Sequence, residues 1–227
     1  MNYELFIAKR IIAGKEYKNS ISSPIIKIAI TAIALGIVIM LIAVTTSAGL
    51  QTKIRDKMAG FKGHVQIVNY DNNNSEVSVV PIDKNQDFYP KFKTISGIKN
   101  IQVFASKGGI LRTEKDFEGI VFKGVSTDYN WSFFKEYLVE GRIPDLTLPR
   151  TKEILLSRTV MSRLQLQLND TILSTFPKNN INKIPSNRKY IIVGIYNTGF
   201  AQFDKSVMIG DLREVQRLNK WTNNQVG

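Results

Sequence analysis

Few residues in this sequence could carry out chemistry, and those that could lie far apart. The 227-residue chain has one histidine, His64, and no cysteine, so a catalytic triad or a zinc site has almost no donors. Two pairs of acids have spacings that suit general acid–base catalysis, Asp83 with Asp87 and Glu114 with Asp116. Both pairs lie in hydrophilic stretches, which favours solvent-exposed surface. We therefore expect no catalytic residues and no metal site, although these residues exclude only two of the commonest enzyme chemistries.

Nucleotide and nucleic-acid binding are not indicated either. A phosphate-binding loop needs the pattern Gly-x-x-x-x-Gly-Lys-Ser/Thr, and the sequence offers only fragments of it at Gly14-Lys15 and Gly108-Gly109. The chain has 31 Lys and Arg against 19 Asp and Glu, a net charge of +12. These basic residues are spread evenly, which fits an anionic membrane surface better than a nucleic acid. We expect a membrane partner, no nucleic acid and no cofactor.

The first element that would position these residues is a long apolar stretch. Residues 28–50 are 23 consecutive residues without a charge, and eleven of them are Ile, Leu or Val. A helix of this length covers roughly 34 Å at about 1.5 Å per residue, enough for the hydrocarbon core of a bilayer. Hydroxyl residues such as Thr31 and Thr45 can bond to the carbonyl one turn earlier. Because the stretch is too long for the apolar region of a signal peptide, we expect a transmembrane helix.

The residues before this stretch predict a short helix at the membrane interface. Apolar residues at positions 5, 6, 8 and 12 fall near one helical face. Ser23 and Pro24 are typical of the start of the long helix, as its N-cap and its first helical residue. Five basic residues precede the apolar stretch and four follow it closely. Charge alone therefore barely favours a cytoplasmic N-terminus.

The long helix is expected to continue beyond the membrane as a stalk. Leu50, Ile54 and Met58 repeat at a spacing of four residues, which places them on one face. Gly60 is expected to cap the helix C-terminus. Residues 24–59 would then form one rod of roughly 54 Å. Such a rod suits either the transmission of motion or a simple tether.

From His64 onward the pattern changes to short strands and helices in mixed order, which predicts an α+β domain. Strands are expected at residues 64–68, 76–80, 101–104, 109–113, 117–124, 153–156, 171–176, 190–196 and 207–209, with the last ending the sheet. Helices are expected at residues 88–96 and 157–166 and from Asp211, as N-cap, to about residue 218. Residues 130–139 are a loop or a short helix. The predicted organisation is an interfacial segment (1–24), a transmembrane helix and stalk (25–60), and a mixed-sheet domain (61–227).

Several short motifs along the chain resemble one family in their order and spacing. They are Glu4-Leu-Phe-Ile-Ala-Lys-Arg10, Leu35-Gly36, Gly49-Leu50-Gln51, His64-Val-Gln-Ile67, Lys123-Gly-Val125, Glu140-Gly-Arg142, Glu153–Arg158, Leu166–Asp170, Val193–Gly199, Phe203-Asp204 and the helix around Gln216. Together they are similar to the permease subunits of lipoprotein-releasing ABC transporters (LolC/LolE type) and their relatives in the MacB/FtsX superfamily. One departure is Asn169, where the family usually has Gly; Asn also tolerates a left-handed backbone.

This resemblance implies a fold, a location and partners. It implies a domain like the MacB periplasmic core, a bacterial inner-membrane location, a cytoplasmic N-terminus and a periplasmic domain. It also implies a partner ATPase and a second permease copy or paralogue. Members of the family have four spans, three of them after the periplasmic domain, so we expect this chain to be an N-terminal part that lacks the helix contacting the ATPase.

One loop is expected to bind a partner. Within the loop of residues 176–190, residues 184–188 are similar to the region where LolC-type subunits project a hairpin that recruits the periplasmic lipoprotein carrier. Apolar residues on an exposed loop stiffened by proline fit partner binding, and basic residues there would steer an acidic partner. The residues concerned are Ile181, Lys183, Ile184, Pro185 and Arg188. An ordinary solvated connection is the alternative for this loop.

The sequence thus indicates a non-enzymatic permease subunit, with lipoprotein release as the leading function. In it, ATP hydrolysis by the partner would move the extracytoplasmic domain. One alternative is a membrane-anchored sensor or scaffold without a transport role. Others are permeases of the MacB/FtsX type that serve efflux or regulate a hydrolase.

Overall fold

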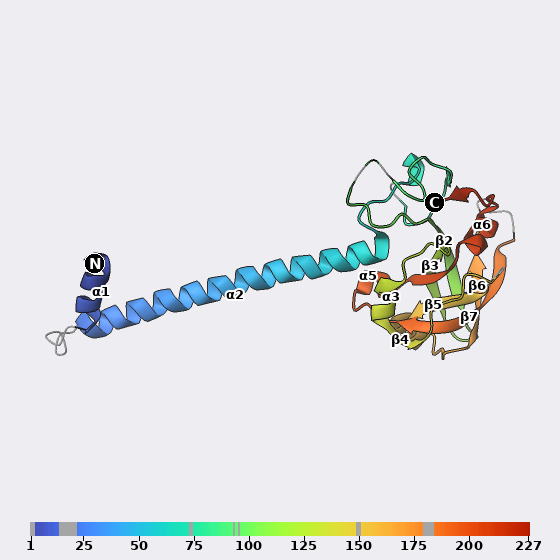
Figure 1. The fold of residues 1–227 in the computed structure, drawn as a ribbon. Coiled ribbons are helices and arrows are strands. Elements are labelled where there is room, and N and C mark those ends of the chain that lie inside the picture. The colour runs from blue at the N-terminus through green and yellow to red at the C-terminus, as the bar shows by residue number, and fades with distance from the viewer. Residues whose placement is uncertain are drawn as a thin grey trace. The chain divides into compact units, whose positions relative to one another are not determined.

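The computed structural model describes residues 3–13, 22–72, 75–92, 94, 96–148, 151–178 and 184–227. The chain divides into two compact units, Met1–Met58 and Ala59–Gly227. The first unit contains α1 (Tyr3–Ala13) and most of α2 (Ser22–Lys62). The second contains the last residues of α2 and every strand of the described residues. This combination of helices and one main sheet is the α+β class that the sequence predicts (Figure 1).

Helix α2 is long, apolar and continuous. Within it, Pro24–Lys62 is the one segment of the described residues long and apolar enough to cross a membrane, judged by length and composition. The side chains of residues 24–56 are exposed. The hydroxyl groups of Thr31 and Thr45 donate to the carbonyls of Lys27 and Leu41, each at 2.8 Å. The predicted bonding of these hydroxyl groups within the helix is therefore confirmed.

The C-terminal end of α2 lies beyond the predicted one. Gly63, and not Gly60, ends the helix: its φ is +89°, and its N–H donates to the carbonyl of Ala59 at 2.8 Å. A glycine in the left-handed region is the usual way to stop a helix, since it has no Cβ to clash. Gly60 has another reason to be glycine, because a Cβ there would lie 2.2 Å from the ring of Phe133.

The N-terminal end of α2 is at Ser22, two positions before the predicted first residue Pro24. The expected capping side chain, Ser23, lies outside the described side chains. The expected short helix before the apolar stretch is present as α1.

One seven-stranded sheet organises the second unit. Its order is β4-β7-β5-β8-β3-β2-β6, and its two parallel pairs are β3–β8 and β5–β7. The strands are β2 (Phe104–Arg112), β3 (Phe117–Val125), β4 (Leu138–Gly141), β5 (Glu153–Ser157), β6 (Thr171–Phe176), β7 (Ser186–Tyr196) and β8 (Val207–Asp211). The helices are α3 (Ser132–Tyr137), α4 (Arg158–Arg163), α5 (Ala201–Asp204) and α6 (Leu212–Asn219). A separate pair joins β1 (Ile82–Asp83) to β9 (Gln225–Val226).

The long strand β7 closes this sheet on itself. Its first half pairs with β6, from Ser186 with Phe176 to Ile191 with Thr171. Its second half pairs with β5 and β4. Because β6 also pairs with β2 at the other end of the strand order, both ends of the sheet are joined through β7. Closure removes the long exposed edges that an open sheet would present.

The core forms where the closing strands meet the helices. The rings of Phe122, Phe176 and Tyr190 lie with their centroids 5.3 to 6.4 Å apart. Helix α6 packs on β2 and β3. The carboxylate of Asp211 accepts a hydrogen bond from the backbone N–H of Arg213 at 2.8 Å, so the predicted N-cap of this helix is confirmed.

Four predicted elements are wrong in the second unit. Residues 64–68 and 76–80 are not strands, and no helix covers the described residues of 88–96. The strand predicted at 101–104 is also absent, because one strand, β2, runs from Phe104 to Arg112. At 76–80 the side chain of Asn72 replaces a partner strand: its Oδ1 accepts from Val79 and Val80, and its Nδ2 donates to the carbonyl of Val80. Strand β8 does not end the sheet but lies between β5 and β3. Sequence patterns do not show such side-chain bonding or strand order.

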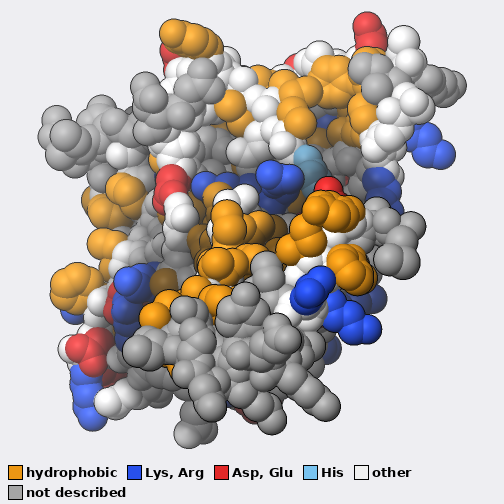
Figure 2. Space-filling view, turned by 90° about the vertical axis from the view of Figure 1, so that its left-hand side faces the viewer, with side chains coloured by type: hydrophobic (Ala, Val, Ile, Leu, Met, Phe, Trp, Pro, Cys, Tyr) orange, Lys and Arg blue, Asp and Glu red, His pale blue; other side chains and the backbone are white. Residues whose placement is uncertain are grey.

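The segment after α2 leaves apolar side chains uncovered. Val65 and Tyr70 are 83% and 85% exposed, and Ile67 is exposed as well. Figure 2 shows hydrophobic side chains next to Lys and Arg side chains on the face that it presents. Alternation of apolar and polar residues predicts a strand only when the apolar side chains share one buried face. At 64–68 they are exposed, so the strand predicted there is absent.

Candidate functional site

The predicted partner-binding loop connects the two strands that close the sheet. β6 ends at Phe176 and β7 begins at Ser186, and the two strands pair antiparallel as a hairpin that residues 177–185 connect. Ile184 is 83% exposed, and Pro185 is exposed too. Ile181 and Lys183 lie outside the described residues. An apolar side chain at an exposed hairpin tip suits partner contact, as the sequence analysis expects.

Arg188 is not in the loop. It lies within β7, where it pairs with Ser174 of β6, and its guanidinium donates to the carbonyl of Asn187 at 2.9 Å. The strand begins four residues earlier than predicted because residues 186–189 pair with β6. Long-range pairing of this kind is decided by tertiary structure and not by the local polar sequence.

The hairpin is rooted in the core. Phe176, at the loop end of β6, and Tyr190, which pairs with Ile172 towards the other end of that strand, are both 1% exposed. Gly109 of β2 leaves room for Phe176: a Cβ there would lie 2.6 Å from that ring. The pKa of Tyr190 is raised by burial and by the nearby Glu214. The paired strands below the loop are therefore held in place by close packing in the core.

A second feature, which the sequence analysis missed, is the anchor of the α2 C-terminus. Phe61 is 4% exposed. Its ring is stacked on that of Phe203 with the centroids 3.9 Å apart, and the edge contact with Phe134 measures 5.6 Å. Phe61 follows Met58 at a spacing of three residues, so the apolar series on the stalk could have pointed to it.

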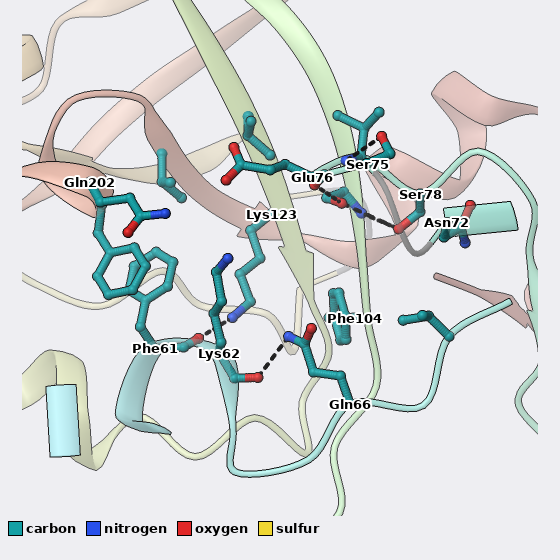
Figure 3. A pocket seen from close by; sticks show the side chains of 16 residues that line it. Phe61, Lys62, Gln66, Asn72, Ser75, Glu76, Ser78, Phe104, Lys123 and Gln202 are labelled. Atoms are coloured by element: carbon teal, nitrogen blue, oxygen red, sulfur yellow. Dashed lines mark hydrogen bonds between the residues drawn. The ribbon is translucent and has the colours of Figure 1, made fainter. Parts of the chain in front are cut away.

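Lys123 of β3 completes this anchor. Its side chain is nearly buried, and its Nζ donates to the backbone carbonyl of Phe61 (Figure 3). The ammonium group also lies 5.0 Å from the ring of Phe61, 5.6 Å from that of Phe104 and 5.5 Å from that of Tyr129. Burial lowers the pKa of Lys123 to about 8, and the charge of Lys62 adds to this. A cation at a helix C-terminus is favourable because it faces the free carbonyls.

Two further motif residues meet across the sheet. Gly141 of β4 pairs with Gly194 of β7, and a Cβ on Gly141 would lie 2.2 Å from the carbonyl oxygen of Val193. Gly141 has a φ of +79°, a region that glycine adopts without strain. The two glycines therefore permit a close approach of the backbones where β4 joins the sheet.

Beside this contact, Arg142 forms an ion pair with Glu153. The guanidinium donates to both carboxylate oxygens, and the carboxylate also accepts from the N–H of Asp145 at 2.8 Å. These bonds hold the pKa of the Glu153 carboxyl below its usual range, with Arg142 as the largest cause. A bidentate pair of this geometry orients the loop after β4. The role of this motif is structural.

The residues that could have served catalysis lie on the surface. Asp83, Asp87, Glu114 and Asp116 are all exposed, and so is His64. Neither acid pair lies in a pocket that the described residues form. Their placement agrees with solvated surface.

Comparison with known proteins shows the family. The model of the MacB-like periplasmic core domain matches residues 28–226, so the chain belongs to this family. The resemblance to MacB/FtsX-type permeases of the LolC type is thereby confirmed.

One protein similar to this chain is the lipoprotein-releasing system transmembrane protein LolC of Neisseria meningitidis serogroup B. It is 22% identical over 226 residues, which cover 96% of this chain and 52% of that protein. The chain thus spans about half the length of the curated relative that it matches. A solved structure, the extracellular domain of the noncanonic ABC-type transporter YknZ from Gram-positive bacteria, is 16% identical. It covers 59% of this chain and 64% of that one with a TM-score of 0.42.

Proposed function

We propose that this chain forms part of the permease subunit of an ABC transporter that releases lipoproteins from the bacterial inner membrane. The match to the MacB-like family over residues 28–226 carries the proposal, and the similarity to LolC over 96% of the chain supports its finer form. In this proposal α2 crosses the membrane, the N-terminus is cytoplasmic and the second unit is periplasmic. The segments 1–24, 25–60 and 61–227 then have the locations that the sequence predicts.

The proposed mechanism couples a partner ATPase to the sheet through α2. ATP hydrolysis in the cytoplasm would displace the helix. Because α2 is one continuous helix whose last turn is held by Phe61 and Lys123, its end cannot shift without the strands and helices that bury it. This supports the transfer of motion into the second unit. The ATPase and a second permease copy or paralogue are proposed partners.

The hairpin tip is proposed to bind the periplasmic carrier that accepts the lipoprotein. The proposed contacts are Ile181, Lys183, Ile184 and Pro185, with Arg188 at the base of the hairpin. The exposure of Ile184 supports this role, since an apolar anchor that is uncovered in the free protein is available for burial on a partner. Basic residues beside it would speed association with an acidic carrier.

The experiment that tests this function is depletion of the complete gene product in cells. We expect lipoproteins bound for the outer membrane to accumulate in the inner membrane, measured by membrane fractionation. The complete gene restores release, and the same gene with Phe61→Ala restores less at equal protein level. Normal lipoprotein sorting together with greater drug sensitivity would point to efflux instead. Normal sorting with neither defect would favour a scaffold.

A further inference from the structure

A pocket of about 560 Å³ lies beside the anchor of α2, entirely within the second unit. Its apolar wall includes Phe61, Phe104, Phe203 and Val207, and Lys123 lies in its floor (Figure 3). This volume falls in the range of pockets that hold small organic ligands, roughly 300–1,000 Å³. Apolar and polar side chains line this pocket in similar numbers, so it suits a ligand that has both an apolar body and a charged head group.

The positive charge of this pocket comes from two neighbouring lysines, Lys123 and Lys62. The ammonium groups of Lys123 and Lys62 are near enough for Lys62 to affect the pKa of Lys123. Among the described residues no carboxylate lies within 4 Å of the Lys123 Nζ. Of its three N–H donors, one is directed at the carbonyl of Phe61. The other two can bond to an incoming anion.

A purely structural role explains this arrangement only in part. A buried ammonium is costly unless it is paired, and an apolar side chain would fill the same space without that cost. The hydrogen bond to Phe61 and the ring contacts offset part of it, yet they do not require an open pocket beside the cation. A bound anion would account for both the buried cation and the cavity.

We propose that this pocket binds a small amphipathic anion, whose carboxylate or phosphate group lies against Lys123 and Lys62 and whose apolar body lies against the phenylalanine rings. A flat aromatic or short branched body suits the apolar part of the lining, to which the half-buried Phe104 contributes a ring and Val68 and Val77 contribute branched side chains. Glu76, also in the lining, disfavours anions with a second negative group at the far side. This proposal does not rest on the proposed transport function. Ligand binding and lipoprotein release are measured separately, so one can fail without the other.

The test is a calorimetric titration of the full chain in lipid nanodiscs, with empty nanodiscs subtracted. The probes are 3-phenylpropionate, phenyl phosphate and the neutral 3-phenylpropionamide. Both anions should bind, and the amide should bind at least about tenfold more weakly, because only an anion is attracted by the lysines. The ratio of the two anion affinities shows which head group the pocket prefers.

Variants and pH then locate the binding. Lys62→Gln should weaken 3-phenylpropionate binding about 3- to 5-fold, the effect of one partly exposed charge. Glu76→Gln should strengthen it about 2- to 3-fold, and Lys115→Gln, a control on an exposed turn, should change nothing. Affinity should fall about tenfold between pH 7 and pH 9, as Lys123 loses its proton. Burial raises the pKa of the facing Tyr129, whose hydroxyl group therefore stays neutral over this interval.

Three results would overturn the proposal. Equal affinity for acid and amide would mean that the cations play no part. An equal loss in the Lys115 control would mean binding to the surface in general. No heat with either anion would leave the pocket empty and Lys123 as the helix anchor alone. Because the pH series uses the wild-type chain, it decides the role of Lys123 even if a Lys123 variant fails to fold.

Discussion

Lys123 of β3 donates a hydrogen bond from its ammonium group to the backbone carbonyl of Phe61, so the sheet supplies the cation that closes the last turn of α2. The two residues are 62 positions apart in the sequence. A single buried lysine thereby joins the end of the long helix to the core of the second unit. We expect the stability of the second unit, the pH dependence of that stability and the proposed transfer of motion to depend on this contact.

The buried lysine should make the second unit more stable as the pH rises from about 8 towards 10. Its pKa is about 8 in the folded chain against 10.5 for an ordinary lysine, so over this interval the unfolded state binds more protons and the free energy of unfolding rises. We expect an increase of about 1–2 kcal/mol between pH 7.5 and 9.5. Urea unfolding followed by tryptophan fluorescence measures it, since both tryptophans lie in the second unit.

The control for this pH dependence is Lys123→Met, which should remove the rise. Above about pH 10 the trend should reverse, because burial raises the pKa of Tyr129 and Tyr196 and the unfolded chain then loses protons first. A rise of the same size in the Lys123→Met variant would assign the effect to other groups.

Removing Phe61 should destabilise the second unit strongly. Phe61→Ala deletes a buried ring from an aromatic cluster, and such deletions cost about 3–5 kcal/mol. For the same reason a segment of residues 59–227 should unfold at a clearly higher temperature than a segment of residues 64–227. Phe117→Ala is the matched control, since Phe117 is 74% exposed; it should change stability by less than about 0.5 kcal/mol. Equal melting temperatures of the two segments would contradict the anchoring role.

Gly194 should not tolerate a side chain. A Cβ there would lie 2.3 Å from the carbonyl oxygen of Arg142 and 2.5 Å from Leu155, so Gly194→Ala forces β4 and β7 apart at a cost of about 2–3 kcal/mol. Gly119→Ala, on β3 with nothing within 4 Å of the new Cβ, should be neutral or slightly stabilising. Chemical denaturation of both variants is the measurement. Similar stabilities would mean that the strands adjust without cost.

The topology of the proposed permease can be tested in this cysteine-free chain. Glu4 and Asn85 are both exposed, so Glu4→Cys and Asn85→Cys should be reactive wherever reagent reaches them. In cells whose outer membrane is permeable, an impermeant maleimide should label position 85 only, and position 4 should react after lysis of the inner membrane. Labelling of position 4 but not of position 85 before lysis would contradict the transport proposal.

The hairpin tip should contribute most of the affinity for a carrier. Replacing Ile184 and Pro185 by Gly and Ser should weaken carrier binding by roughly 2–4 kcal/mol, the range of interface anchors, without loss of folding. Ile98→Ser, at another exposed apolar residue, is the control. The measurement is a titration with the cognate carrier, and equal affinities would leave the loop as a connection. Arg188→Ala should mainly slow association in a salt-dependent way.

Local patterns in the sequence determined a large part of this protein. The uncharged run at 28–50 predicted the apolar helix, because hydrophobicity and length alone decide whether a helix suits a bilayer. Strand β6 and the N-cap at Asp211 also follow from local patterns, since alternation and capping involve neighbours in the sequence. The order of short motifs was enough to indicate the family that the comparison confirmed.

The tertiary structure alone decided how these parts meet. No local signal places Lys123 under the carbonyl of Phe61 or pairs Gly141 with Gly194, because each contact joins segments far apart in the chain. The extension of β7 to Ser186 depends on β6 as its partner, and the irregular path of 76–80 depends on the side chain of Asn72. Pairing and burial energies exceed local preferences of a few tenths of a kcal/mol per residue. The long apolar helix, the start of α6 and the family motifs were therefore predictable from the sequence, whereas the anchor and the pocket beside it were not.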